Sequence, residues 1–365
     1  MRYSAFSHLV ASVLASLPFV ASAFADAGLQ VSGPIVHDNL AIYLVRGVGS
    51  GGAVPLTLQE ALAKGAVKVH ETGSVNELTV ENTGKDEVYV QAGDIVKGGQ
   101  QDRVLSVDLL LPPRSGEVLI AAFCVEHGRW TARGDEDVRQ FSSAAAAMPS
   151  HEAKVAMRAY AVAAATPAAD AATRTMAYAG GAGVGQSQQE IWSTVRKTQD
   201  NLSRSVGAPV AAPASPSSLQ LSLENDKLKQ SQSAYIAALQ GAGETGDDIV
   251  GYVFAINGKI NSGDVYASNA LFRKMWRKLL AANVTEAIGV KDTAGAPPPS
   301  VKDVEAFLTT ASTGVKAERA INVSVRLATL DGDASLYAET RRADGSWVHR
   351  NFLAKDFLGK DFLGK

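Results

Sequence analysis

The segment CVEHGRW at positions 124–130 places a thiol, a carboxylate, an imidazole and a guanidinium within seven residues. Cys124 is the only cysteine in the chain and the one candidate for a thiol nucleophile. If it were one, Glu126 and Asp102 would act as acid and base partners, and Arg129 would hold an anionic substrate. This arrangement predicts a thiol-dependent hydrolase or transferase, which is one of two functions considered for the chain.

The geometry of an extended strand argues against the most reactive version of that site. Successive side chains on a strand point to opposite faces, so Cys124 and Glu126 share one face while His127 lies on the other. His127 is therefore not expected to activate the thiol, and the two do not form a metal pair. The alternative is a cysteine in the core, with Glu126 paired to Arg129, and free cysteines are among the most buried residues.

The turn KGGQQDR at positions 97–103 is the second candidate site. Its two glycines permit positive φ angles and close approach of the backbone to a ligand, and backbone N–H groups in such turns bind anions. Lys97 adds charge, Gln101 adds an amide, and Arg103 can hold a carboxylate through two hydrogen bonds. With Arg129, these side chains are the predicted ligand-binding residues. The alternative is an ordinary hairpin turn with a surface ion pair.

The first 25 residues have the pattern of a signal peptide. Arg2 is followed by an apolar run from Phe6 to Val20, and Ala23-Phe24-Ala25 matches a cleavage site. The apolar run is shorter than the roughly 20 residues that a membrane span requires. We therefore expect cleavage near Ala25 and an exported protein, periplasmic or secreted, without a transmembrane segment.

Composition narrows the remaining classes. The chain has 35 Lys and Arg against 37 Asp and Glu, a formal net charge of −2, which argues against nonspecific binding to nucleic acid. A single cysteine makes no internal disulfide. The six histidines form no zinc-binding spacing, and phosphate-binding loops and Gly-x-Ser-x-Gly elbows are absent. We predict no metal and no cofactor, and a small molecule or a protein as the partner.

Hydrophobic alternation and turn residues predict mainly strands as far as residue 130. Thr57-Leu58-Gln59-Glu60 predicts one short helix through a capping box. The predicted strands are 35–45, 67–71, 76–81, 87–91, 103–111 and 117–125.

The middle of the chain is rich in alanine and predicts helices at 152–165, 187–202 and 219–239. The stretch 166–186 is of low complexity, and the Pro/Ala/Ser-rich segment 205–218 predicts a linker or loop. Asn257-Gly258 then predicts a hairpin of strands 249–256 and 259–266, and Ser268 begins a helix with a deeply packed face. Further strands are expected at 320–330, 335–340 and 346–352.

Together these elements predict an α+β fold with antiparallel β-rich sheets, an Ala-rich helical middle, and a C-terminal helix with strands. The predicted boundaries are a signal peptide at 1–25, an N-terminal part at 26–204, the linker or loop at 205–218, a C-terminal part at 219–352 and a tail at 353–365. The tail duplicates Lys-Asp-Phe-Leu-Gly. The sequence leaves open whether the late strands complete the first sheet or form a second one.

Several motifs together resemble the ARG-and-rhodanese-phosphatase-superfamily-associated protein domain, a bacterial family. The resemblance covers roughly residues 35–352. By that resemblance the family pattern includes Lys97, Gln101, Arg103, Cys124, Glu126, Arg129 and Trp130. It is carried by the segments 57–61, 80–84, 98–103, 124–130, 188–192 and 263–276.

Two interpretations of this pattern stay open. The turn and the strand end form a shared pocket, or Gln101, Asp102 and Arg103 form a structural lock with Glu126 and Arg129. The first predicts a noncatalytic exported domain that binds a ligand or partner through the 97–103 turn, and this is the leading hypothesis. The alternative is the thiol enzyme, which requires an accessible thiol of low pKa.

Overall fold

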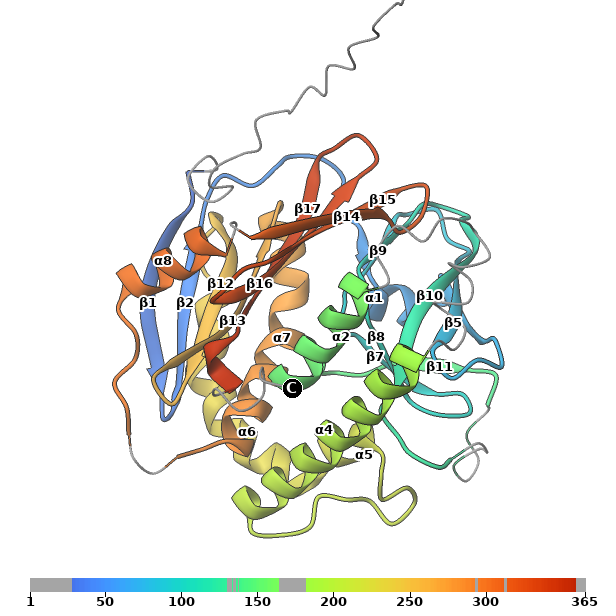
Figure 1. Ribbon diagram of the computed structural model, residues 1–365, viewed down its shortest axis with the longest axis horizontal. Coiled ribbons are helices and arrows are strands. Elements are labelled where there is room, and N and C mark those ends of the chain that lie inside the picture. The colour runs from blue at the N-terminus through green and yellow to red at the C-terminus, as the bar shows by residue number, and fades with distance from the viewer. Residues whose placement is uncertain are drawn as a thin grey trace, which may run out of the picture.

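The computed structural model describes residues 28–129, 133, 136, 138–163, 182–292, 295–311 and 314–358. Helices α2 (His151–Ala163), α4 (Ala182–Val206) and α7 (Asn269–Gly289) lie between an eight-stranded sheet, on the left in Figure 1, and smaller sheets on the right. The predicted α+β class is confirmed. Within the described residues, no helix combines the length and apolar composition of a membrane span.

The large sheet is antiparallel and joins both ends of the chain. Strands near the N-terminus pair directly with the predicted hairpin, and the terminal strands continue the same sheet. The late strands therefore share one sheet with the first two N-terminal strands, whereas the other N-terminal strands form smaller, separate sheets. Its order is β1 (Gln30–His37), β2 (Leu40–Arg46), β12 (Ile249–Ile256), β13 (Lys259–Tyr266), β17 (Trp347–Ala354), β16 (Ser335–Arg342), β15 (Val325–Asp331) and β14 (Val315–Ala320).

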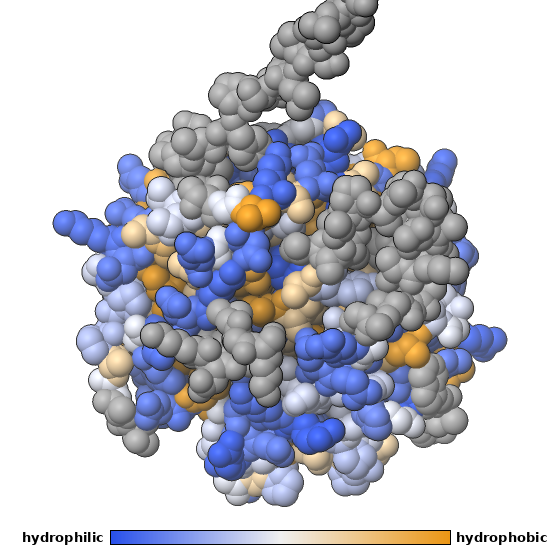
Figure 2. Space-filling model, viewed as in Figure 1, coloured by the Kyte–Doolittle hydropathy of each residue, from blue (hydrophilic) through white to orange (hydrophobic). Residues whose placement is uncertain are grey.

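Strand β2 explains how both faces of this sheet become buried. Alternate side chains point to opposite faces of a strand. Leu40, Ile42 and Leu44 pack in the larger core with α7, whereas Tyr43 and Val45 pack beneath α8 (Val301–Thr310). The run from Leu40 to Val45 is therefore apolar throughout, as a strand covered on both sides requires. Figure 2 shows that hydrophilic residues dominate the visible face of the molecule, with small hydrophobic patches between them.

The smaller sheets carry the first candidate site. The six-stranded sheet has the order β11 (Phe141–Ser143), β7 (Ile95–Gly98), β8 (Arg103–Leu105), β10 (Gly116–Cys124), β5 (Glu77–Asn82) and β4 (Val67–Glu71). A three-stranded sheet consists of β3 (Leu56–Thr57), β6 (Val88–Val90) and β9 (Leu109–Leu111), and α1 (Leu58–Ala63) follows β3.

Local sequence signals predicted several ends of elements correctly. Thr57 and Glu60 form the expected capping box of α1. Asn257 and Gly258 both have positive φ in the tight turn between β12 and β13. Ser268 caps α7 by accepting a hydrogen bond from Leu271 N. Each of these signals is confined to a few consecutive residues.

Three predicted strands are wrong in extent because a turn or bend in the chain divides each one. The strand predicted at 35–45 is two strands, since Asp38 adopts a positive φ between β1 and β2. The strand predicted at 103–111 is β8 and β9, which belong to different sheets. The strand predicted at 320–330 falls across β14 and β15.

Two helix predictions also need correction, and one helix was missed. α4 begins at Ala182, before the predicted start at residue 187. The helix predicted at 219–239 is interrupted at Asn225, which caps the second piece, giving α5 (Leu219–Leu223) and α6 (Asp226–Leu239). α8 was not predicted, although Ser300 and Asp303 form its capping box. Short 3₁₀ helices occupy Gln240–Gly243 and Asp356–Leu358.

Several sequence-based predictions concern residues outside the described ranges. These are the signal peptide at 1–25, residues 166–181 of the Ala-rich stretch, Trp130 and the second copy of the tail repeat.

Candidate functional site

The two glycines of the 97–103 turn serve packing within the chain. Gly98 and Gly99 both have positive φ. A Cβ atom on Gly98 would lie 2.4 Å from the carbonyl oxygen of Gln140, and one on Gly99 would lie 2.2 Å from the ring of Phe141. The small residues therefore let the turn pass close to the segment that leads into β11, which accounts for them without a ligand.

Asp102 lies at the centre of a buried ionic cluster. Its two carboxylate oxygens accept hydrogen bonds from Arg133 Nη1 and Nη2 at 2.6 and 2.8 Å. Ser218 Oγ and the backbone N–H of Gly98 donate two further bonds, at 2.8 and 3.0 Å. The side chain of Asp102 is fully buried. All of its acceptor capacity is thus used inside the protein.

Glu126 occupies the same cluster. Arg129 Nε donates to it at 2.7 Å, Ser215 Oγ donates a second bond, and the backbone N–H of Asp102 donates a third at 3.1 Å. Burial alone would raise the pKa of Glu126, but the bonds from Arg129 and Ser215 lower it below its usual value. We call this cluster the charged lock. Its members are Asp102, Glu126, Arg129, Arg133, Ser215 and Ser218.

The predicted ligand residues Gln101 and Arg103 are buried beside the lock. Gln101 Nε2 donates to the carbonyl of Glu126 at 3.2 Å, and Arg103 Nη1 donates to the carbonyl of Gln101 at 3.0 Å. The carboxylate partner of Arg103 is Glu71 on β4, at 3.4 Å, and the Arg103 side chain is fully buried. Arg103 therefore meets a carboxylate as expected, but one that belongs to this chain.

Lys97 and Arg129 complete the predicted set. Lys97 Nζ bonds both carboxylate oxygens of Glu224, at 2.9 and 2.8 Å, and keeps 24% of its side-chain exposure. Arg129 bonds Glu126 and the backbone carbonyls of Gly98 and Gly99. The geometry thus matches the structural lock more closely than the shared pocket.

Cys124 is the last residue of β10, where it pairs with Arg103 across the ladder. The thiol is buried and approaches the carbonyl of Val75 at 3.5 Å. Burial raises its pKa to about 11. The strand ends here, so the alternation that was extended to His127 does not apply beyond Cys124. His127 instead packs its ring edge-on against Trp192.

Sequence reasoning missed four residues of this region. Arg133, Ser215 and Ser218 belong to the lock, and the two serines show that the segment 205–218 is a loop packed against the sheet. Gln188 bonds both the N–H and the C=O of Cys124, each at 2.9 Å, as a neighbouring strand would. The sequence pattern predicts Gln188 only as a residue at the start of the helix 187–202.

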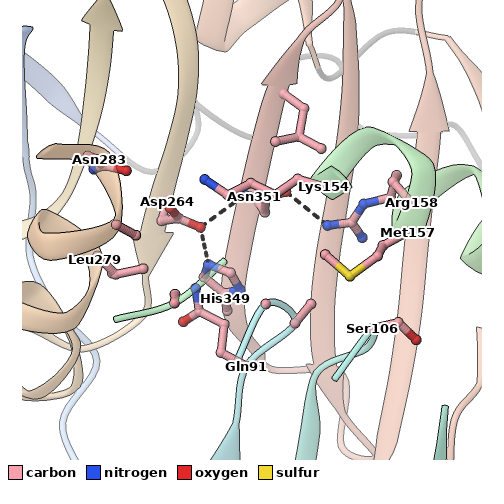
Figure 3. A pocket seen from close by; sticks show the side chains of 15 residues that line it. Gln91, Ser106, Lys154, Met157, Arg158, Asp264, Leu279, Asn283, His349 and Asn351 are labelled. Atoms are coloured by element: carbon pink, nitrogen blue, oxygen red, sulfur yellow. Dashed lines mark hydrogen bonds and ion pairs between the residues drawn. The ribbon is translucent and has the colours of Figure 1, made fainter. Parts of the chain in front are cut away.

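A second polar region surrounds a small cavity between α2, α7, β13, β17 and the loop after β6. The cavity has a volume of about 40 Å³, which is room for about three water molecules at roughly 10–15 Å³ each. Figure 3 shows how polar side chains from these separate elements converge on it. We call it the α2 cavity. Its polar lining includes Gln91, Lys154, Arg158, Asp264, His349 and Asn351.

One wall of the α2 cavity is a carboxylate–imidazole–carboxylate arrangement. His349 Nδ1 lies 2.8 Å from Asp108 Oδ2, and Nε2 lies 3.0 Å from Asp264 Oδ1. Burial alone would lower the pKa of His349, but the two carboxylates raise it to about 9. The same ring holds the pKa of Asp108 at about 2 against the effect of burial. We call this arrangement the Asp–His–Asp triad.

Both carboxylates of the triad are fully engaged. Asp108 also accepts bonds from Tyr89, Thr340 and the N–H of Ala92, at 3.1, 2.6 and 2.8 Å. Asp264 also accepts bonds from Tyr252 and Asn351, at 2.8 and 2.9 Å. The triad is therefore a rigid, satisfied wall.

The opposite wall is provided by α2. Lys154 and Arg158 are four residues apart, so they lie on one face of the helix, and both line the cavity. Arg158 Nη2 donates to Asn351 Oδ1 at 2.9 Å. Lys154 Nζ lies 3.9 Å from Glu286 Oε2, beyond hydrogen-bond distance.

The chain is similar to one known protein family. The profile of the ARPP-1 domain, the ARG and Rhodanese-Phosphatase-superfamily-associated Protein domain, matches residues 28–353. The chain belongs to the ARPP-1 family. No curated protein and no solved structure matches the chain.

The matched range of the ARPP-1 domain contains both the charged lock and the α2 cavity. The cavity residues come from six separate segments of the chain, so no local spacing could predict them. A weak signal existed nonetheless. Asp264 and His349 are polar residues of predicted strands, and such residues require partners when they are buried. Lys154 and Arg158 likewise interrupt an Ala-rich helix at a spacing of four.

Hydrogen bonds within the chain occupy the reactive side chains around the α2 cavity. Both ring nitrogens of His349 are bonded to carboxylates, so neither is free to exchange a proton with a ligand. The hydroxyl of Ser106, which lines the cavity, donates to the carbonyl of Ala121. In the described part of the chain, no group of three or more His, Cys, Asp or Glu side chains is arranged to hold a metal ion.

Proposed function

We propose that this ARPP-1 protein is an exported, noncatalytic binding protein that takes a small polar ligand into the α2 cavity. The observation that carries the proposal is the contrast between the walls of that cavity. The Asp–His–Asp triad is fully satisfied, whereas the facing side chains Lys154 and Arg158 have donors to spare. Unfilled donors beside open space favour a ligand that supplies acceptors.

This proposal keeps the binding role expected from the sequence and moves the site. Gln101, Arg103 and Arg129 bond groups of their own chain, and the first two are buried. Gln101 Oε1 and Arg103 Nε have no hydrogen-bond partner, but both side chains are buried, so a ligand would have to displace the surrounding chain to reach them. Lys97 is the accessible member of the predicted set, and its ammonium group is already paired with Glu224.

The thiol enzyme is supported less well than binding. A thiol nucleophile must be accessible and must ionise near neutral pH. Cys124 is buried, and burial raises its pKa to about 11. The α2 cavity is lined by neither Cys124 nor Glu126.

Export and the class of partner remain part of the proposal. They rest on the signal-peptide pattern of residues 1–25 and on the net charge of −2, which favours a small molecule or a protein over nucleic acid. N-terminal sequencing of the protein made in a bacterium with a signal peptidase would test export. We expect a mature chain that begins near Asp26, and an intact Met1 terminus in the periplasm would contradict cleavage.

The binding proposal is tested by filling the α2 cavity. Ala147 lines it and Ala146 does not, although both are buried in the same segment. We expect Ala147→Leu to weaken binding at least tenfold and Ala146→Leu to change it less than twofold. Calorimetric titration with a panel of small carboxylates, phosphates, amines and sugars provides the measurement.

Two outcomes would contradict the binding proposal. In the first, a compound binds wild type and both leucine variants equally, which would place the site elsewhere. In the second, no compound of the panel binds wild type. Conversion of a bound compound, abolished by Cys124→Ala, would instead support the thiol enzyme.

A further inference from the structure

The charge of the ligand can be inferred from the hydrogen bonds that the α2 cavity leaves unmade. A guanidinium group has five N–H donors, and an ammonium group has three. Within the described part of the chain, Arg158 makes one side-chain hydrogen bond, to the neutral side chain of Asn351. Lys154 makes none there; its nearest carboxylate is 3.9 Å away and its nearest ring, that of Phe254, is 5.6 Å from Nζ.

These two cations are nevertheless largely removed from water. The side chain of Lys154 keeps 20% of its exposure, and Arg158 keeps 9%. Burial lowers the pKa of Arg158, which indicates that its charge is incompletely compensated. A buried charge without a full set of partners is costly, so its retention beside a cavity requires a compensating acceptor.

The acidic groups around the cavity do not supply that acceptor. Asp264 and Asp108 already accept bonds on both oxygens, chiefly from His349, Asn351 and Tyr252 for Asp264. Glu286, which does not line the cavity, accepts from the N–H of His151 and from Asn261 on Oε1, and burial raises its pKa. Its Oε2 is buried without a hydrogen-bond partner and stays 3.9 Å from Lys154 Nζ, too far for a hydrogen bond. Of the charged side chains that line the cavity, Asp264 is therefore satisfied, whereas Lys154 and Arg158 keep free donors.

We propose that Lys154 and Arg158 bind an oxyanion group, a carboxylate or a phosphate, in the α2 cavity. This inference rests on the proposed binding function and names the class of ligand. The planar fork of Arg158 suits two parallel bonds to such a group, and Lys154 adds a compact positive charge.

The size of the cavity agrees with one oxyanion group. Room for about three water molecules admits a group of a few non-hydrogen atoms and excludes a larger molecule. The remaining exposure of Lys154 marks a side on which the cavity reaches solvent. A larger molecule would thus place only its anionic end between α2 and the triad.

The experiment uses inorganic phosphate and acetate as separate probes, titrated calorimetrically against the full mature protein. We expect at least one of the two to bind, and Lys154→Met and Arg158→Met each to weaken that binding at least tenfold. Arg158→Lys keeps the positive charge but not the forked geometry of the guanidinium group, and we expect it to lose less affinity than Arg158→Met. Lys197→Met is the matched control, because Lys197 is an exposed cation on α4 outside the cavity, and it should change affinity less than twofold.

Thermal stability separates a ligand-binding role from a structural one. Arg158→Met removes a buried charge with few partners, so we expect the ligand-free variant to melt at a temperature at least as high as wild type. A structural role predicts a lower melting temperature together with the loss of binding. The inference would be overturned if Arg158→Met both melts at a lower temperature and loses binding, and if refolding the variant restores its affinity to the level of Arg158→Lys.

The failure of this inference differs from the failure of the proposed function. Suppose that Ala147→Leu abolishes the binding of a neutral or cationic compound, while Lys154→Met and Arg158→Met leave its affinity unchanged. The cavity would then bind a ligand that is not an anion. If phosphate or acetate binds all of these variants as well as wild type, the anion site is elsewhere. If Ala147→Leu affects no compound that wild type binds, the proposed function itself is wrong.

Discussion

The charged lock and the α2 cavity both gather charges from distant segments, but they differ in how those charges are satisfied. In the lock, Asp102 accepts four hydrogen bonds and Glu126 at least three, and the side chains fill the space between them. In the cavity, the acids are satisfied while Lys154 and Arg158 are not. A network in which the buried groups have made their hydrogen bonds stabilises one structure. Unpaired donors beside open space instead favour the binding of a partner.

The largest effect is expected from removing the central acid of the lock. Asp102→Ala removes the carboxylate that takes two hydrogen bonds from Arg133, which keeps Glu136 at 2.9 Å and Glu126 at 3.5 Å, and the loss of one partner from a buried charged network costs up to about 3–5 kcal/mol. Urea unfolding measures the change. Asp248→Ala is the control, because its ion pair with Arg46 is exposed and should be worth less than about 1 kcal/mol. Equal costs for the two variants would show that the lock contributes little to stability.

The next effect depends on pH and concerns the wall of the cavity. The pKa of His349 is raised from about 6.5 to about 9 in the folded state. Its stabilising contribution is therefore fully present below pH 6.5 and is lost as the pH rises through 9. At roughly 1.4 kcal/mol per unit, this contribution amounts to about 3 kcal/mol.

The variant His349→Gln isolates that contribution. We expect its destabilisation relative to wild type to shrink by about 3 kcal/mol between pH 6 and pH 10. Burial raises the pKa of Tyr89, Tyr252 and Tyr266 well above 10, so their ionisation in the unfolded chain lowers stability near pH 10, but it does so in wild type and variant alike and cancels in the difference. Unfolding curves at five pH values supply the test. A pH-independent difference would mean that the histidine acts through shape alone.

A smaller effect is expected at Cys124, which lies beside the lock. Cys124→Ala removes one buried atom and should cost about 0.5–1.5 kcal/mol, as other deletions of a single buried group do. A thiol reagent should modify Cys124 only as fast as the protein unfolds, because the thiol is buried. Rapid labelling of the native protein would return attention to the thiol enzyme.

The smallest effect is expected at Lys97, on the surface of the lock. Its ion pair with Glu224 is partly exposed, so Lys97→Met should change the free energy of unfolding by less than about 1 kcal/mol. We also expect its affinity for phosphate and acetate to match that of wild type. A large loss of affinity here would return the ligand site to the 97–103 turn, as the sequence first indicated.

The sequence predicted what depends on neighbouring residues. The capping box at Thr57, the turn at Asn257-Gly258 and the cap at Ser268 each act within four residues, and each was located correctly. Five members of the lock region were also grouped together, because the segments 98–103 and 124–130 both belong to the family pattern. Their roles as internal partners depend on Arg133, Ser215 and Ser218, which carry no motif.

What escaped prediction depends on pairing between distant segments. The division of 103–111 between two sheets follows from the positions of β6 and β10, which no local pattern encodes. The α2 cavity exists because β13, β17 and α2 meet, and its residues span positions 91 to 353. The spacing of Lys154 and Arg158 in an Ala-rich helix was the one local sign of it.

The pairing of β2 with β12 has a consequence for the biosynthesis of the chain. The partners are separated by more than 200 residues. At about 5–20 residues per second, a ribosome makes β12 roughly 10–40 s after β2. During that interval β2 exposes two apolar faces and an edge ready for the wrong partner. We therefore expect a chaperone that holds unfolded chains to bind the nascent protein. The risk of aggregation should fall once the late strands have been made and have paired with β2.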